Sequence, residues 1–197
     1  RLVQTDGMYL GGNTTNVLAE GNYLTRVGEG IDMGLNKNVI LRNNIIISAS
    51  IWGIKIGQGS KDCLVEKNYV EDGGFAALHA YGGFGSNGIT TGVIFRQNVA
   101  VDTNRSLTFP GRSDEHYAAV HFLATGEVYS PDLIGDCQDN TVEYNVLIQP
   151  PGNLNMRYAI DEGAASRKNH FRYNYIEGEF KSGIWYHVHP ESDITEY

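Results

Sequence analysis

The most constraining feature of the sequence is an asparagine that recurs at one place in six similar segments. Two of the segments are NVILRNNII (38–46) and GVIFRQNVA (92–100). A second family of segments, GMYLGG (7–12), GIDMGL (30–35) and GIKIGQ (53–58), recurs upstream with a spacing of 23 residues. Aligning the six segments superimposes Asn22, Asn44, Asn68, Asn98, Asn145 and Asn174.

A repeat of this length predicts a solenoid. One unit holds two or three short strands and cannot enclose a core alone, whereas stacked units bury a continuous one. Stacked strands lie ~4.8 Å apart, so equivalent side chains form columns. Asparagines in such a column can hydrogen-bond from coil to coil where the chain bends. We therefore expect apolar residues such as Ile46 to face inward and each recurring asparagine to lie at a corner.

The residue two positions before each recurring asparagine is charged and alternates in sign. Opposite charges on neighbouring strands stabilise a sheet by ~0.2–1 kcal/mol per contact, and like charges destabilise it. The alternation continues from Arg96 to Glu143 only if no further coil lies between them, which predicts one coil with an inserted loop at 110–137. The six residues are Glu20, Arg42, Glu66, Arg96, Glu143 and Arg172.

On these asparagine and G-I-x-I/M-G motifs the chain resembles the right-handed parallel β-helix proteins of the pectate-lyase-like group. The resemblance implies an all-β, single-stranded right-handed parallel β-helix of about seven coils. We expect one domain over 1–197, as a portion of a longer β-helix. An antiparallel jelly roll is the alternative, although its strands would not repeat at a constant spacing. The group contains polysaccharide lyases, glycoside hydrolases, tailspikes and non-catalytic adhesins, so function must be argued from the site.

Composition narrows the choice of partner. A net charge of −8 argues against nucleic acid, because phosphate binding needs clustered Lys and Arg. No window approaches the length of apolar sequence that a membrane-spanning helix needs. Cys63 and Cys137 form neither a metal-ligand pattern nor a disulfide framework. The resemblance implies a polysaccharide partner and a location outside the cell or on a cell or virion surface.

The middle residues of the G-I-x-I strands should point outward and form an exposed column, because side chains alternate faces along a strand. Tyr81 and His187 should lie in the next column. In this class of solenoid a sugar chain usually crosses such a sheet, and loops 81–92 and 110–137 would wall the groove. Aromatic rings there could stack on sugars. The expected column is Tyr9, Asp32, Lys55, His79, then Thr108 or His121, Asp161 and Trp185.

Elimination from a uronic-acid polysaccharide is the preferred chemistry. It needs a cation for the substrate carboxylate, a base for the adjacent proton and an acid for the leaving oxygen. Lys55 or Arg112 suits the first task, His79 or His121 the second, and Tyr81 the third. Substrate-binding candidates are Tyr9, Asp32, Arg112, Trp185 and His187.

Four alternatives stay open. Calcium held by Asp32 or Asp161 could replace the cation, as in several β-helix lyases, although no calcium motif is visible. Hydrolysis could use Asp161 with Asp114 or Glu115 as paired carboxyls. The chain could also be a binding or structural solenoid without chemistry, with further coils or an oligomer partner covering its ends. Asp32 and Lys55 could equally form a surface ion pair of little energetic weight.

Overall fold

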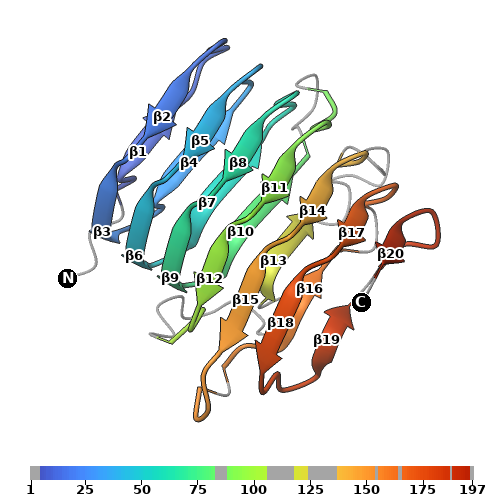
Figure 1. Ribbon diagram of the computed structural model, residues 1–197. Coiled ribbons are helices and arrows are strands. Elements are labelled where there is room, and N and C mark those ends of the chain that lie inside the picture. The colour runs from blue at the N-terminus through green and yellow to red at the C-terminus, as the bar shows by residue number, and fades with distance from the viewer. Residues whose placement is uncertain are drawn as a thin grey trace.

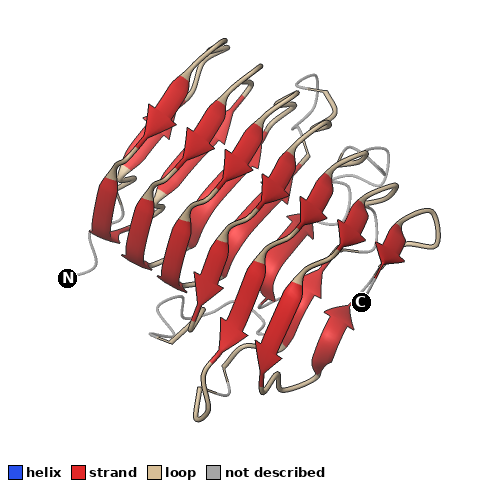
Figure 2. Ribbon diagram, in the orientation of Figure 1, coloured by secondary structure: helices blue, strands red, loops and turns tan. Residues whose placement is uncertain are grey.

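The computed structural model describes residues 5–82, 88–105, 118–123, 137–153, 155–163, 166–186 and 188–195. These residues form strands and turns without a helix, and the strands wind through three parallel sheets (Figures 1 and 2). The fold is a parallel β-helix, as the sequence predicts, and the antiparallel alternative is wrong for the described strands. Among the same residues, no helix has the length and apolarity needed to cross a membrane.

The first sheet carries one strand from each of seven coils. Its order is β1 (Met8–Leu10), β4 (Ile31–Gly34), β7 (Trp52–Gly57), β10 (Ala76–Tyr81), β13 (Ala118–Leu123), β16 (Tyr158–Asp161) and β19 (Gly183–Tyr186). Strand β13 lies inside the segment predicted as an inserted loop, so that segment contributes one strand to the sheet. Residues 110–117 and 124–136 of the segment lie outside the described part of the chain.

The other two sheets complete the coils. The second sheet is β2 (Leu18–Glu20), β5 (Ile40–Arg42), β8 (Leu64–Glu66), β11 (Ile94–Arg96), β14 (Thr141–Glu143), β17 (His170–Arg172) and β20 (Asp193–Thr195). The third sheet is β3 (Tyr23–Val27), β6 (Ile45–Ala49), β9 (Tyr69–Gly73), β12 (Val99–Val101), β15 (Val146–Gln149) and β18 (Tyr175–Gly178).

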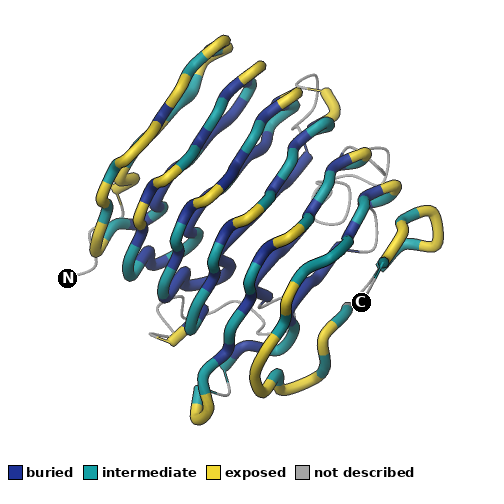
Figure 3. Tube along the Cα trace, in the orientation of Figure 1, coloured by how far each residue is buried: buried dark blue, intermediate teal, exposed yellow. Residues whose placement is uncertain are grey.

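The core runs through the interior of the coils. Alternation of faces buries Ile46 completely, while Ile45 next to it is exposed. Phe95, Phe122 and Phe171 meet edge to face across the interior, with ring centroids 6.1 and 5.7 Å apart. Figure 3 shows buried residues continuing through the middle coils and more exposed residues in the first and last coils.

The recurring asparagines form an unbroken ladder between the second and third sheets. Each side-chain amide donates to the Oδ1 of the next asparagine at 2.8–3.0 Å, from Asn22 through to Asn174. From Asn44 onward each amide also donates to a backbone carbonyl of the preceding coil. Buried amides are thus satisfied at every corner, which confirms the coil-to-coil prediction.

The residue before each ladder asparagine has a left-handed backbone. Its φ lies between 54° and 69° in all six coils. This conformation turns the chain from the second sheet into the third, and it disfavours β-branched side chains. None occurs at these positions, which are Gly21, Asn43, Lys67, Gln97, Tyr144 and Tyr173.

The charged column is in register through six coils. Arg42 lies between Glu20 and Glu66, and Arg96 lies beside Glu143 with no strand between them. The side chains bond in three separate pairs, at 2.9 Å for the first, 2.8 Å for the second and 3.1 Å for the third. These pairs are Glu20–Arg42, Glu66–Arg96 and Glu143–Arg172.

Candidate functional site

The outward residues of the first sheet lie in one register. Asp32 pairs with Lys55, Lys55 with His79, and His79 with His121. The structure thus places His121 in the column, while its alternative Thr108 lies outside the described residues. We call the following set the first-sheet column: Tyr9, Asp32, Lys55, His79, His121 and Asp161.

The prediction that Trp185 belongs to this column is wrong. Tyr186 pairs with Asp161, and Trp185 pairs with the inward-facing Ile160. The Trp185 ring packs edge to face on Phe171 in the core, with centroids 5.8 Å apart. A shift of one residue along a strand moves a side chain to the opposite face, and the last coil was aligned with that error.

The prediction that the column is exposed is also wrong. The side chain of Lys55 is only 12% exposed, His79 and His121 are 2% exposed, and Asp161 is fully buried. Tyr9, at 65%, is the exposed member. The column points away from the core, so its burial requires cover on the outer side of the coils. Phe75 and Trp52 supply part of that cover.

Trp52 reaches the outer face because the strand alternation breaks at Gly53. A Cβ on Gly53 would lie 2.4 Å from Val70 in the core, so Gly53 and Ile54 both face inward and Trp52 turns out. The indole stacks on the His79 imidazole at 4.8 Å, with 11° between the planes. Sequence reasoning missed Trp52, although a glycine beside a strand tryptophan signals such a break.

Lys55 is held by two carboxylates and two aromatic rings. Its Nζ lies 2.5 Å from Glu29 and 3.1 Å from Asp32. The same atom lies 5.0 Å from the Trp52 centroid and 5.7 Å from that of Tyr81, within cation–π range. The predicted Asp32–Lys55 pair therefore exists, but it is largely buried and includes Glu29, which the sequence did not suggest.

Burial sets the protonation of this cluster. Desolvation raises the pKa of Glu29 to about 7, against the opposing effect of Lys55. Desolvation also raises the pKa of Asp32. Burial alone would lower the pKa of Lys55, but the hydrogen bond that Lys55 donates to Glu29 and the charge of Asp32 raise it, so the ammonium stays charged. The cluster thus contains a fixed cation and a carboxyl that titrates near neutral pH.

Tyr81 covers Gly57 beside Lys55. A Cβ on Gly57 would lie 2.0 Å from the Tyr81 ring, so only glycine leaves room for this ring position. Burial raises the pKa of Tyr81 to about 12, although the Lys55 charge acts in the opposite direction. The phenol therefore keeps its proton at neutral pH and can act as a proton donor.

His79 and His121 stack on each other, with ring centroids 4.9 Å apart. The Nδ1 of His79 lies 3.1 Å from the backbone carbonyl oxygen of His121. A carbonyl only accepts, so Nδ1 carries the proton and the lone pair of the neutral ring is on Nε2. The next strand brings Asp161 Oδ2 to 3.7 Å from His121 Nε2, and Oδ1 accepts from the Gly163 amide at 2.9 Å. Titratable side chains from three neighbouring strands thus lie next to one another.

Glu162 is also buried, but its hydrogen bonds are to residues near the end of the solenoid. Its carboxylate accepts from Asn169 Nδ2 at 2.8 Å, from the His189 amide at 2.7 Å and from the Ser192 hydroxyl. Burial raises its pKa to about 7 despite these donors. Glu162 therefore fastens the turn that begins the last strand of the second sheet.

Three carboxylates near the start of the chain bear on metal binding. Oxygens of Asp6, Glu29 and Asp32 lie within 4.8 Å of one another. The Lys55 ammonium contacts two of them and supplies the charge that a cation would bring. Calcium at Asp32 or at Asp161 therefore stays a prediction.

The remaining sequence candidates fall on two regions. Arg112 and His187 lie outside the described residues, as do Asp114 and Glu115 of the predicted hydrolytic pair. Trp185 instead lines a hollow at the end of the stack with Phe171 and Ile176. The structure thus brings together Lys55, His79, Tyr81, His121 and Asp161, five of the residues expected to carry the chemistry.

Comparisons with known proteins complete the description. No protein-family model and no curated protein matches the sequence. Among solved structures, the chain is similar to an alginate lyase from Paenibacillus sp. str. FPU-7. The match has 12% sequence identity and a TM-score of 0.47, and it covers 97% of this chain and 78% of that one. A likeness this remote carries no argument about reaction, substrate or site residues.

Proposed function

We propose that the chain acts outside the cell on a uronic-acid polysaccharide and cleaves it by β-elimination at the first-sheet column. The observation that carries the proposal is the grouping of Lys55, Tyr81 and His79 on neighbouring strands. These residues offer a cation, a protonated phenol and an imidazole with its lone pair on Nε2. They are the three kinds of group that elimination beside a carboxylate requires.

The step balances with these groups alone. Nε2 of His79 takes the proton from the carbon beside the carboxylate, and that electron pair becomes the new carbon–carbon double bond. The bond to the leaving oxygen breaks, and the phenol of Tyr81 gives that oxygen its proton. Lys55 neutralises the charge that develops on the substrate carboxylate. His121 holds His79 through its carbonyl, and Asp161 lies behind His121.

Glu29 gives the site a way to release Lys55. With a pKa of about 7, Glu29 accepts a proton near neutral pH and then no longer competes for the ammonium. A substrate carboxylate arriving at Lys55 would favour that protonation, because two like charges at one cation repel each other. In this proposal Lys55 therefore exchanges the Glu29 carboxylate for the substrate carboxylate when the substrate binds.

Binding without chemistry is the second candidate function. The observation that favours it is burial: Tyr81 is 7% exposed and both histidines are 2% exposed. A sugar chain reaches these groups only if the cover on the outer face moves. A protein that binds glycans elsewhere on its surface would keep such a column as a purely structural cluster.

Activity on a panel of uronans separates the two functions. Elimination gives unsaturated ends that absorb in the ultraviolet, and we expect this signal to fall ~10²–10⁴-fold in His79→Gln and Tyr81→Phe. Lys55→Met is a third site variant. His170→Gln is the control for His79→Gln, and Lys61→Met is the control for Lys55→Met, because both control residues lie on the second-sheet side. Signal that survives in the site variants contradicts the assigned roles. Reducing ends without absorbance indicate hydrolysis, and binding without products indicates the second function.

A further inference from the structure

The outer face of the third sheet carries a straight row of apolar and aromatic side chains. The row takes the first outward position of each strand, and adjacent members are paired in register. Tyr23 is 63% exposed and Tyr175 is 57% exposed. We call this row the tyrosine strip: Tyr23, Ile45, Tyr69, Val99, Val146 and Tyr175.

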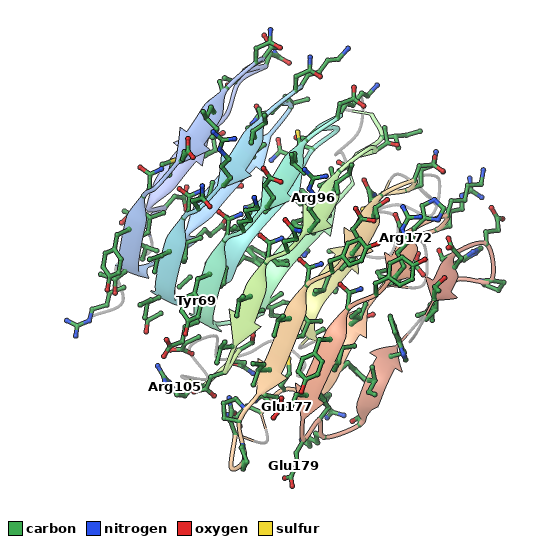
Figure 4. The ribbon with its side chains drawn as sticks, viewed as in Figure 1. Tyr69, Arg96, Arg105, Arg172, Glu177 and Glu179 are labelled. Atoms are coloured by element: carbon green, nitrogen blue, oxygen red, sulfur yellow. The ribbon has the colours of Figure 1, made fainter. Side chains whose placement is uncertain are left out.

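Two of the three tyrosines are fixed in orientation by a carboxylate on their own strand. The Tyr69 hydroxyl donates to Glu71 at 3.0 Å, and the Tyr175 hydroxyl donates to Glu177 at 2.7 Å. Glu71 also contacts Arg105 at 3.3 Å. Figure 4 labels Tyr69, Arg105 and Glu177 on this side of the molecule. The rings of Tyr69 and Tyr175 are thus each held by a hydrogen bond to a carboxylate two residues further along the same strand.

The dimensions of the strip favour a linear chain over a second copy of the protein as its occupant. Six strands at a spacing of ~4.8 Å give a length of ~24 Å, while two outward residues along a strand give a width of only ~7 Å. That footprint is far below the ~800 Å² per partner that a stable protein interface buries. A long, narrow and flat surface instead fits an extended linear chain.

The chemistry of the strip fits a sugar chain without charge. Pyranose rings present apolar C–H faces that stack on flat aromatic rings, and their hydroxyls can bond phenols and carboxylates. Tyr23 and Tyr69 are two strands apart, at ~9.6 Å, and Tyr69 and Tyr175 are three apart, at ~14.4 Å. Glu177 lies beside Tyr175 and would repel the carboxylates of a uronan. Beside Tyr69, the three carboxylates of Glu71, Asp72 and Asp102 outnumber the single Arg105 that they contact.

We propose that the tyrosine strip is a binding site for a neutral, extended polysaccharide, separate from the first-sheet column and independent of the reaction there. The glycan chain lies along the solenoid axis, with its rings over Tyr23, Tyr69 and Tyr175. The aliphatic residues between the tyrosines provide the floor under the intervening sugars.

Affinity electrophoresis in gels that contain soluble glycans tests the proposal. The probes are hydroxyethylcellulose, xylan and glucomannan as neutral chains, and polygalacturonate and alginate as acidic ones. We expect retardation by at least one neutral probe. The variant with Tyr23, Tyr69 and Tyr175 all changed to Ala should lose at least ~10-fold in affinity, because each stacked ring contributes ~2- to 12-fold. The variant with all three changed to Phe should keep most of the binding.

Leu18→Ala is the control, since Leu18 is an exposed apolar side chain, 52% accessible, on the second sheet. It should bind as the parent chain does, and circular dichroism should show the same fold for every variant. The proposal is overturned if no neutral probe retards the parent chain or if the triple Ala variant binds equally well. It is also overturned if these changes abolish retardation by acidic probes only, or if they convert a dimer to a monomer in sedimentation.

Discussion

Removing one amide from the middle of the asparagine ladder should destabilise the fold far more than removing one from its end. The Asn68 side chain donates to Leu41 O and to Asn98 Oδ1, both at 3.0 Å. It also accepts from the backbone amide of Asn44 at 3.0 Å and from the Asn44 side chain at 2.9 Å. Asn68→Ala therefore deletes four buried hydrogen bonds.

Each of those bonds contributes ~0.5–1.5 kcal/mol net, so we expect a loss of about 4 kcal/mol in the free energy of unfolding. Asn22→Ala deletes a single side-chain bond, to Asn44 Oδ1 at 2.8 Å, at a partly exposed position. We expect ~1 kcal/mol there. Asn68→Asp should destabilise the fold at least as much as Asn68→Ala, because the carboxylate oxygen that replaces Nδ2 would face two acceptor oxygens in a buried site.

Urea unfolding followed by circular dichroism measures the differences, with the linear dependence on denaturant giving each free energy. Coincident transitions at two wavelengths should be checked first, since solenoids can unfold in more than one step. Equal losses in Asn68→Ala and Asn22→Ala would refute the reasoning, because the position in the ladder would then have no energetic meaning.

Three further predictions concern single sites. Gly57→Ala should displace the Tyr81 ring, which a Cβ would approach to 2.0 Å, so near-UV circular dichroism should change and any lyase activity should fall with the fold retained. The pKa of Glu162 is raised from 4.5 to about 7, so its contribution is full below pH 4.5 and is lost as pH rises through 7. Unfolding free energies of the parent and Glu162→Gln between pH 5 and 8 should diverge by up to ~3 kcal/mol, and parallel curves would contradict this. Cys63 and Cys137 are buried thiols, so a thiol reagent should label them only after denaturation, and fast labelling of the native chain would count against their burial.

The repeat predicted the fold because one rule of stacking acts on every coil. The asparagine ladder and the alternation of Glu20 with Arg42 follow from that rule alone, and they also identified Arg96 and Glu143 as neighbours. A second set of polar corner residues escaped detection, because it begins only at Asn140. Asn140 and Asn169 bond across coils at 3.0 Å where the earlier coils carry valine or cysteine.

The site was predicted less completely, since its burial depends on groups that the repeat does not contain. Column membership of Lys55, His79 and His121 followed from register. Trp52 entered through a break at Gly53, and Glu29 entered from a turn between strands, so neither obeys the alternation used to find the others. Trp185 was misplaced because the last coil has looser motifs and an error of one residue reverses the face.

The left-handed corner before each ladder asparagine presents one variable side chain per coil at a regular spacing. Glycine, asparagine, lysine, glutamine and tyrosine all occupy that corner without altering the bend, since the turn is made by the backbone. Side chains that are not β-branched could therefore be substituted at these corner positions, ~4.8 Å apart, without changing the interior. Six lysines at these positions would form an evenly spaced row of positive charges that could bind an anionic polymer or a mineral surface.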